Sequence, residues 1–227
     1  MERELQKIFP ERMAVDLSSA EVLSNLKNFQ KVMMMYNCAI REVRTKFEVL
    51  NDELSTTDNR NPIEMIKSRV KKPESIVGKL MRRNLAINME NIMEEIHDVA
   101  GIRVICSFVD DIFKVADMLS AQDDVTVLQV KDYIKNPKEN GYRSYHMIIE
   151  IPVFFSNVKQ SIKVEVQLRT IAMDFWASLE HSMKYKKDIK NSEEIADELK
   201  KCADLISDTD FKMQEINNKI NKVKKEA

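Results

Sequence analysis

One nine-residue run, Lys138 to His146, brings together the side-chain types that a nucleotide-binding loop needs. It reads KENGYRSYH and supplies cations, aromatic rings, a hydroxyl and an imidazole just before an apolar-alternating stretch. An aromatic ring can stack on a base, and cationic donors can hold phosphates. Asn140-Gly141 is also an ordinary turn signal, so the run alone does not separate a nucleotide site from a plain turn.

A second candidate anion-binding segment lies between Lys67 and Arg83. Its seventeen residues carry seven cations and one acid, Glu74, which gives a net charge of +6. The cations are Lys67, Arg69, Lys71, Lys72, Lys79, Arg82 and Arg83. Such a patch raises the local concentration of an anionic ligand. A solvated helix face is the other interpretation.

Carboxylates with metal-binding potential accompany two strand-like segments. Residues 162–169 read IKVEVQLR and alternate without exception, which places Glu165 and Gln167 on one polar face. Asp98 lies just upstream of a second such segment, which starts at Gly101. If the two strands are adjacent, Asp98 and Glu165 could converge on Mg²⁺, which is commonly held by one or two carboxylates and substrate phosphates. A solvent-facing polar side is the alternative.

A hydrolase site is not supported. His97-Asp98 resembles the metal-binding pair of HD-type phosphohydrolases, but such a site needs further histidines, and only His146 and His181 remain. The three cysteines (Cys38, Cys106 and Cys202) have no metal-ligand spacing and are expected to be structural thiols.

The composition describes a soluble, folded chain. It has 227 residues, of which 44% are hydrophobic and 32% charged, and its net charge is −1. No apolar run approaches the roughly 20 residues that span a bilayer, and the N-terminus lacks a secretory apolar region. We therefore expect a cytoplasmic protein without a membrane partner.

Long helices are predicted at both ends. Ser18 and Glu21 have capping-box spacing, and an unbroken heptad stripe follows from Val22 to Leu54. The turn-rich segment 55–62 ends this helix. A second stripe contains Ile195, Leu199, Cys202, Ile206, Thr209, Met213, Ile216, Ile220 and Val223. Neither helix is stable alone, so each must pack on the body, on the other, or on another subunit.

Between these helices the pattern alternates between strand and helix. The predicted strands are 101–108, 125–133, 145–153 and 161–169, and the predicted helices are 110–121 and 170–185. The architecture is a small mixed sheet flanked by helices. We divide the chain into an N-terminal helical region (1–62), a core (63–186) and a C-terminal helix (187–227).

Five segments resemble the synthetase domain of the RelA/SpoT family in order and spacing, over roughly residues 60 to 186. They are residues 69–76 (RVKKPESI), 98–103 (DVAGIR), 138–146, 165–170 (EVQLRT) and 176–181 (WASLEH). The chain is similar to a small alarmone synthetase with the synthetase domain only, of the RelP rather than the RelQ type. The resemblance implies an α+β fold with a mixed sheet of about five strands.

It also implies an activity: transfer of pyrophosphate from ATP to the 3′-hydroxyl of GDP or GTP, with release of AMP, to make (p)ppGpp. On the ATP side, Arg69 and Arg103 would sandwich the adenine, a geometry that suits guanidinium planes. The expected contacts to ATP phosphates are Lys71, Ser75 and Lys79.

The same resemblance assigns the remaining roles. Asp98 and Glu165 would hold Mg²⁺, and Glu165 would also be the base for the 3′-hydroxyl. Tyr142 would stack on the guanine, and the turn that contains Asn140 would present it. The expected contacts near the transferred group are Lys138 and His146, with Gln167 close to the nucleotides.

Family members of this size are homotetramers with terminal helices at their interfaces, so a homo-oligomer is expected. At the cleft where the RelQ type binds (p)ppGpp, Met65, Lys67 and Asp174 replace Phe, Thr and Asn, which argues against activation by product. Two alternatives remain open: an RNA- or nucleotide-binding regulatory module without turnover, and a silent scaffold. The preferred acceptor among GMP, GDP and GTP is not indicated.

Overall fold

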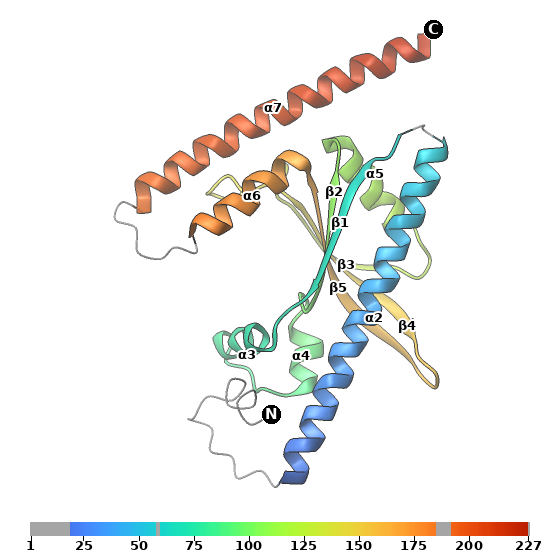
Figure 1. Cartoon of the computed structure of the whole chain (residues 1–227), viewed down its shortest axis with the longest axis vertical. Coiled ribbons are helices and arrows are strands. Elements are labelled where there is room, and N and C mark those ends of the chain that lie inside the picture. The colour runs from blue at the N-terminus through green and yellow to red at the C-terminus, as the bar shows by residue number, and fades with distance from the viewer. Residues whose placement is uncertain (1–18, 58–59, 185–191, 227) are drawn as a thin grey trace.

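The chain forms a five-stranded mixed sheet flanked by helices in a computed structural model that describes residues 19–57, 60–184 and 192–226 (Figure 1). Its elements are α2 (Ser19–Thr57), β1 (Ile63–Val70), α3 (Pro73–Arg82), α4 (Met89–Glu95), β2 (Ala100–Cys106), α5 (Val109–Ser120), β3 (Thr126–Asp132), β4 (Tyr145–Phe154), β5 (Lys159–Thr170), α6 (Ile171–Lys184) and α7 (Ser192–Glu226). The expected α+β fold is confirmed.

The sheet has the order β1-β2-β5-β4-β3, so the last strand in the sequence lies at its centre. β2 and β5 pair in parallel, and every other neighbouring pair is antiparallel. All four predicted strands are present, with ends within two residues of those expected. β1, at one edge, and the short helices α3 and α4 were not predicted individually.

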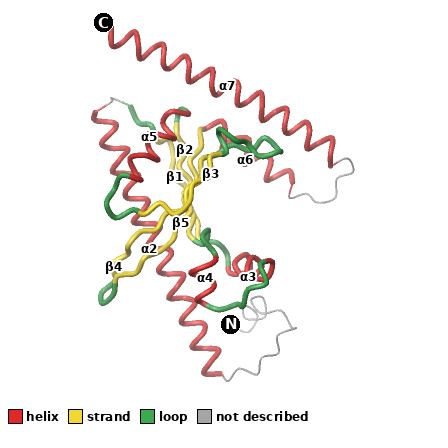
Figure 2. Tube along the Cα trace, turned by 180° about the vertical axis from the view of Figure 1, so that it is seen from behind, coloured by secondary structure: helices red, strands yellow, loops and turns green. Residues whose placement is uncertain are grey.

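The alternation of β5 produces one apolar and one polar face, as predicted. Ile162, Val164, Val166 and Leu168 are all buried. Helices α2 and α5 contact the sheet, and their apolar residues join those of the strands in one core. Figures 1 and 2 show α2 running the length of this side. The opposite, polar face carries the candidate site.

The N-terminal helix α2 uses its heptad stripe to pack on the body of the protein. Tyr36, Val43, Phe47, Leu50 and Leu54 of that stripe are buried. This stripe therefore finds its partner within the chain. The proposed capping residue, Ser18, lies outside the described residues.

The C-terminal helix α7 behaves differently. The side chains that it buries include Ala203, Ser207, Asp210 and Gln214, so much of its inward face is polar. Asp210 accepts a hydrogen bond from the Thr170 hydroxyl (2.5 Å), and Gln214 accepts one from the Asp110 amide (3.0 Å). The second half of the predicted stripe, Met213, Ile216, Ile220 and Val223, is exposed instead.

Helix α6 also exposes apolar residues of its helical stripe. Three apolar residues that recur with helical spacing along it, Ile171, Phe175 and Leu179, are each more than 40% exposed. Met173 and Trp176 face inward in their place. Large apolar side chains therefore remain exposed on both C-terminal helices. No helix among the described residues has the length and apolarity needed to cross a bilayer.

Candidate active site

The sheet register aligns charged and polar residues in one row across all five strands. Lys67 of β1 pairs with Arg103 of β2, Arg103 with Gln167 of β5, Gln167 with His146 of β4, and His146 with Lys131 of β3. Paired residues project on the same side of a sheet, so these five side chains share one face. Three of them, Arg103, His146 and Gln167, were predicted site residues.

The next row contains Glu165. Gly101 separates Glu165 of β5 from Arg69 of β1, because it pairs with both. Without a side chain, Gly101 leaves the space between these two side chains open on the polar face. The structure therefore brings Arg69, Arg103 and Glu165 to one face.

Asp98 lies just before β2 and is held by two lysines. The Lys79 ammonium donates to Asp98 Oδ1 at 2.7 Å, and the Lys71 ammonium donates to Oδ2. Burial raises the pKa of Asp98, but the hydrogen bonds and charges of Lys71 and Lys79 outweigh it and lower that pKa below its ordinary value. The predicted phosphate ligands Lys71 and Lys79 are thus neutralised by the predicted metal ligand Asp98.

The acceptor side of the polar face contains a cavity of about 230 Å³. It is lined by Gln129, Lys131, Tyr133, Lys138, His146, Met147, Ile148 and Glu165. Glu165 thus lies in the cavity wall and also in the same row as Arg69, with Gly101 between them. The ammonium of Lys138 lies 4.8 Å from the ring centre of Tyr133 and 4.9 Å from that of Tyr142.

Hydrogen bonds connect the predicted acceptor residues in a chain. Arg169 Nη2 donates to the Tyr142 hydroxyl at 2.6 Å, and that hydroxyl lies 2.8 Å from His146 Nε2. An arginine only donates, so the hydroxyl is free to donate its own proton to Nε2. When it does so, the remaining ring proton of a neutral His146 is on Nδ1, which lies 3.8 Å from Glu165 Oε1.

His146 is neutral near pH 7. Burial lowers its pKa from 6.5 to about 3, assisted by the charges of Arg169, Lys138, Lys131 and Arg103. The approach of Nδ1 to Glu165 is therefore a polar contact rather than an ion pair. The cations that disfavour a charged imidazole are the groups that would attract a phosphate.

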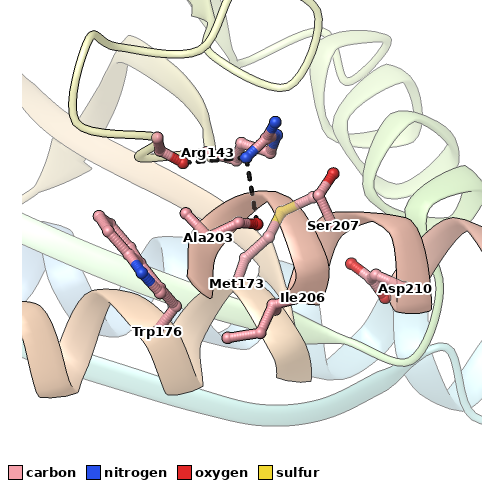
Figure 3. A pocket seen from close by; sticks show the side chains of 8 residues that line it. Arg143, Met173, Trp176, Ala203, Ile206, Ser207 and Asp210 are labelled. Carbon is pink, nitrogen blue, oxygen red and sulfur yellow. Dashed lines mark hydrogen bonds between the residues drawn. The ribbon is translucent and has the colours of Figure 1, made fainter. Parts of the chain in front are cut away.

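The loop 138–144 owes its shape to a glycine and to α7. Gly141 has φ +84°, and a Cβ there would lie 2.5 Å from the Cβ of Ala203. Arg143 donates to the carbonyl of Gly141 at 3.1 Å and to that of Ala203 at 3.4 Å (Figure 3). Asn140 accepts from the Tyr142 amide and donates to Glu180. A small cavity of about 10 Å³ remains between this loop, α6 and α7.

Sequence reasoning missed several residues of this face. Gln129, Lys131 and Tyr133 line the cavity, and their period of two on a predicted strand was the available signal. Arg169 follows Glu165 and Gln167 with the same period of two, whereas Asp174 was considered only as a residue of the (p)ppGpp cleft. Arg169 is buried at the end of β5, and Asp174 lies in the first turn of α6.

The expected metal ligands fit Mg²⁺ only as part of a shared site. Glu165 pairs with Gly101 of β2, and Asp98 lies three residues before Gly101; both offer oxygen atoms alone, which suits a hard cation. Within the described residues, no cluster of three or more His, Cys, Asp or Glu side chains could hold a metal by itself. The remaining ligands would have to come from substrate phosphates and water.

Known proteins match this chain over most of its length. The family model described as "Region found in RelA / SpoT proteins" matches residues 68–190. GTP pyrophosphokinase YwaC of Bacillus subtilis (strain 168) is 44% identical over 196 residues, which cover 86% of this chain and 93% of the relative.

Two solved structures are similar throughout the fold. Small alarmone synthetase 2 from Bacillus subtilis gives a TM-score of 0.76 at 44% identity and covers 85% of this chain and 99% of that one. Small alarmone synthetase 1 from the same species, bound to its product pppGpp, gives 0.77 at 36% identity, with 86% and 98% covered. The higher identity to YwaC agrees with the expected RelP type. The chain therefore belongs to the RelA/SpoT family and is a small alarmone synthetase.

Proposed function

We propose that the protein is a GTP pyrophosphokinase that transfers pyrophosphate from ATP to the 3′-hydroxyl of GDP or GTP and releases AMP. The observation that carries this is the position of Glu165, which shares a row of the sheet with Arg69 and also lines a cationic cavity. It agrees with the name of YwaC, a GTP pyrophosphokinase that is 44% identical. The product is the alarmone (p)ppGpp.

The site has two halves. The ATP half comprises Arg69, Lys71, Ser75, Lys79, Asp98 and Arg103, from β1, α3, β2 and their connections. The acceptor half comprises loop 138–144, His146, Gln167 and the cavity that they border. Glu165 lies at the boundary between them.

In the ATP half, Arg69 and Arg103 stack on the adenine from neighbouring strands. Lys71 and Lys79 exchange the Asp98 carboxylate for ATP phosphates, with Ser75 of α3 as a further phosphate ligand. This exchange leaves Asp98 free to bind Mg²⁺ together with Glu165 and the phosphates. The bound metal would neutralise charge that develops on the transferred group.

In the acceptor half, Tyr142 stacks on the guanine. The Lys138 ammonium, now against the rings of Tyr133 and Tyr142, moves to an acceptor phosphate. Neutral His146 presents its Nδ1–H to the cavity, where it donates to an oxygen near the transferred group. Asn140 maintains the turn, and Gln167 orients Glu165 by donating to its Oε2 at 2.9 Å.

Glu165 then acts as the general base. The 3′-oxygen forms a bond to the β-phosphorus of ATP while the bond from that phosphorus to the α–β bridging oxygen breaks. The proton of the hydroxyl passes to Glu165, and AMP departs with the bridging oxygen. Positioning and charge neutralisation supply most of the catalysis in such a transfer.

The exposed C-terminal apolar surface favours a homo-oligomer, with a tetramer as the expected size. Ile171, Phe175, Ile216, Ile220 and Val223 are each more than 40% exposed on α6 and α7, an arrangement that marks an association surface. We further propose that residues 63–186 form the synthetase core and that residues 187–227 mediate this association. The assembly is expected to work in the cytoplasm. Light scattering that gave a monomer at micromolar concentration would contradict it.

One incubation tests the activity. The purified chain is mixed with ATP, GDP and Mg²⁺, and the products are separated by anion-exchange chromatography. We expect AMP and a guanosine tetraphosphate in equal amounts. An RNA- or nucleotide-binding module would give binding without either product, which is the outcome that would reject the enzyme.

A further inference from the structure

Asp174 is the point at which cations from three strands meet. Its carboxylate accepts from Lys67 of β1 at 3.0 Å, from Arg103 of β2 at 3.0 Å and from Arg169 of β5 at 3.1 Å. The residue is 7% exposed, so these contacts are largely shielded from water. A charged side chain this buried needs partners, and here each partner is a cation.

The two carboxylate oxygens are used differently. Oδ2 accepts from Lys67, whereas Oδ1 accepts from both Arg103 and Arg169. One atom therefore holds two guanidinium groups that would otherwise repel each other. Burial and the neighbouring Arg169 both lower the pKa of Arg103, which shows how unfavourable this pair is without a counter-charge.

The contact with Arg103 is compatible with adenine stacking. Asp174 binds one terminal nitrogen at the edge of the guanidinium, which leaves its flat face available to a base. Arg103 Nε is buried and has no hydrogen-bond partner among the described residues. Asp174 is thus a principal restraint on the orientation of this side chain.

The contact with Arg169 connects Asp174 to the acceptor half. Arg169 donates through its other terminal nitrogen to the Tyr142 hydroxyl at 2.6 Å and to Gln167 Oε1 at 3.1 Å. Its guanidinium carbon also lies 5.1 Å from the centre of the Tyr142 ring. Asp174 therefore reaches the proposed guanine-stacking residue through a single side chain.

We propose that Asp174 is a positioning residue that orients Arg103 for ATP and, through Arg169, Tyr142 for the guanine nucleotide. The inference rests on the proposed function, because it uses the roles of Arg103 and Tyr142. Asp174 contacts neither substrate. Its carboxylate couples the two halves, so that its loss weakens the binding of both nucleotides.

The test compares Asp174→Asn, which removes the charge at nearly constant shape, with Asp174→Glu, which keeps it. Charge-assisted hydrogen bonds are strong, so we expect Asp174→Asn to raise KM for ATP and KM for GDP about tenfold each. Asp174→Glu should stay within about threefold of the wild type in both. Arg44→Gln is the control, since it breaks only an exposed ion pair with Glu48 on α2, the helix that covers the apolar face, and both KM values should change less than about twofold.

Calorimetric titration with GDP alone and with a non-hydrolysable ATP analogue alone separates positioning from folding. If Asp174→Asn has lost its melting transition, Asp174→Asn with Lys67→Gln, which removes one unpaired cation, is titrated in its place with the same expectation. A folded variant that binds both nucleotides normally, or loses only one of them, overturns the proposal. Arg103→Ala is measured in parallel: if it also leaves ATP binding intact, the proposed ATP half is wrong rather than the role of Asp174.

Discussion

The ATP half and the acceptor half of this site are built in opposite ways. In the ATP half, cations proposed to contact ATP are paired with carboxylates: the phosphate ligands Lys71 and Lys79 with Asp98, and the adenine-stacking Arg103 with Asp174. In the acceptor half, Tyr142 and His146 are already linked by a hydrogen bond and border a cavity of about 230 Å³.

This difference separates two strategies for binding a polyanion. In the ATP half, Lys71 and Lys79 are paired with Asp98 before substrate arrives, so phosphate binding there requires an exchange of ion pairs. The acceptor half is preorganised, and α7 supports its loop through Ala203. Preorganisation lowers the cost of ordering a site on binding. We therefore expect substitutions in the acceptor half to act on shape, and those in the ATP half to act on charge.

The largest effect is expected where the halves meet. Glu165→Gln preserves the size of the side chain but removes the base and a metal ligand, so turnover should fall by roughly 10²- to 10⁴-fold. AMP release and the melting temperature are measured together, with Glu94→Gln as a control because Glu94 is an exposed surface glutamate. Wild-type turnover at saturating Mg²⁺ would refute both roles of Glu165.

Tyr142→Ala tests whether the halves are separable. Stacking on a base is worth about 1 to 3 kcal/mol, so KM for GDP should rise about ten- to a hundredfold while KM for ATP changes little. Tyr142→Phe keeps the ring but loses the hydroxyl that bonds to Arg169 and His146, and should have a smaller effect. Unaltered GDP affinity in the alanine variant would exclude the stacking role.

Gly141→Ala tests whether the acceptor loop depends on its shape. The left-handed φ of +84° and the 2.5 Å approach of a new Cβ to Ala203 both oppose the alanine, at a combined cost of about 2 kcal/mol or more. We expect a lower free energy of unfolding and a raised KM for GDP. Urea denaturation and steady-state kinetics measure the two, and unchanged values would mean that the loop tolerates another conformation.

Acidification should destabilise the folded protein because His146 is neutral there and has a lowered pKa. Its pKa is about 3 in the folded protein against 6.5 in the unfolded chain, so the unfolded state binds more protons between these values. The stability that depends on neutral His146 is complete above pH 6.5 and declines as pH falls, by about 2 kcal/mol at pH 5. Urea denaturation of wild type and His146→Gln at pH 7.5 and pH 5 measures this difference. Equal pH dependence in both proteins would show that His146 titrates normally.

Gly78→Ala is the matched substitution in the ATP half and should have the smallest effect, with the opposite sign. Gly78 lies within α3, and a Cβ there would meet only the end of Arg82 at 3.5 Å. Alanine should stabilise the protein by up to about 1 kcal/mol through helix propensity. Thermal denaturation tests this, and destabilisation would mean that α3 needs the flexibility of glycine.

The sequence predicted every strand of the sheet except β1, including the other edge strand, β3. Segment 161–169 alternates because β5 is central and buries one face, so its strand and its polar side were both evident. β1 buries Ile63 but little else, and its residues from Lys67 to Arg69 are exposed. An edge strand of this kind leaves no periodic signal. The seven residues of α4 are too few to show a helical period.

The candidate site was predictable where chemistry is local and not where it depends on packing. Loop 138–146 contains its own ring, turn and cations, whereas Asp174 acquires its role only when β1, β2 and β5 are placed side by side. The inward face of α7 shows the same limit. Hydrogen bonds from Thr170 to Asp210 and from Asp110 to Gln214 dock this helix, and an apolar stripe cannot predict them.

The strand order also determines when this site can form during synthesis. β5 hydrogen-bonds to both β2 and β4, so the sheet stays in two separate pieces, β1–β2 and β3–β4, until residue 170 has left the ribosome. Each piece exposes an open edge that can pair wrongly with another chain. Glu165 and Gln167 both belong to β5, the strand that joins the two pieces. A nascent chain therefore gains its central strand and its proposed catalytic base in the same step, and neither is present in a product released before that point.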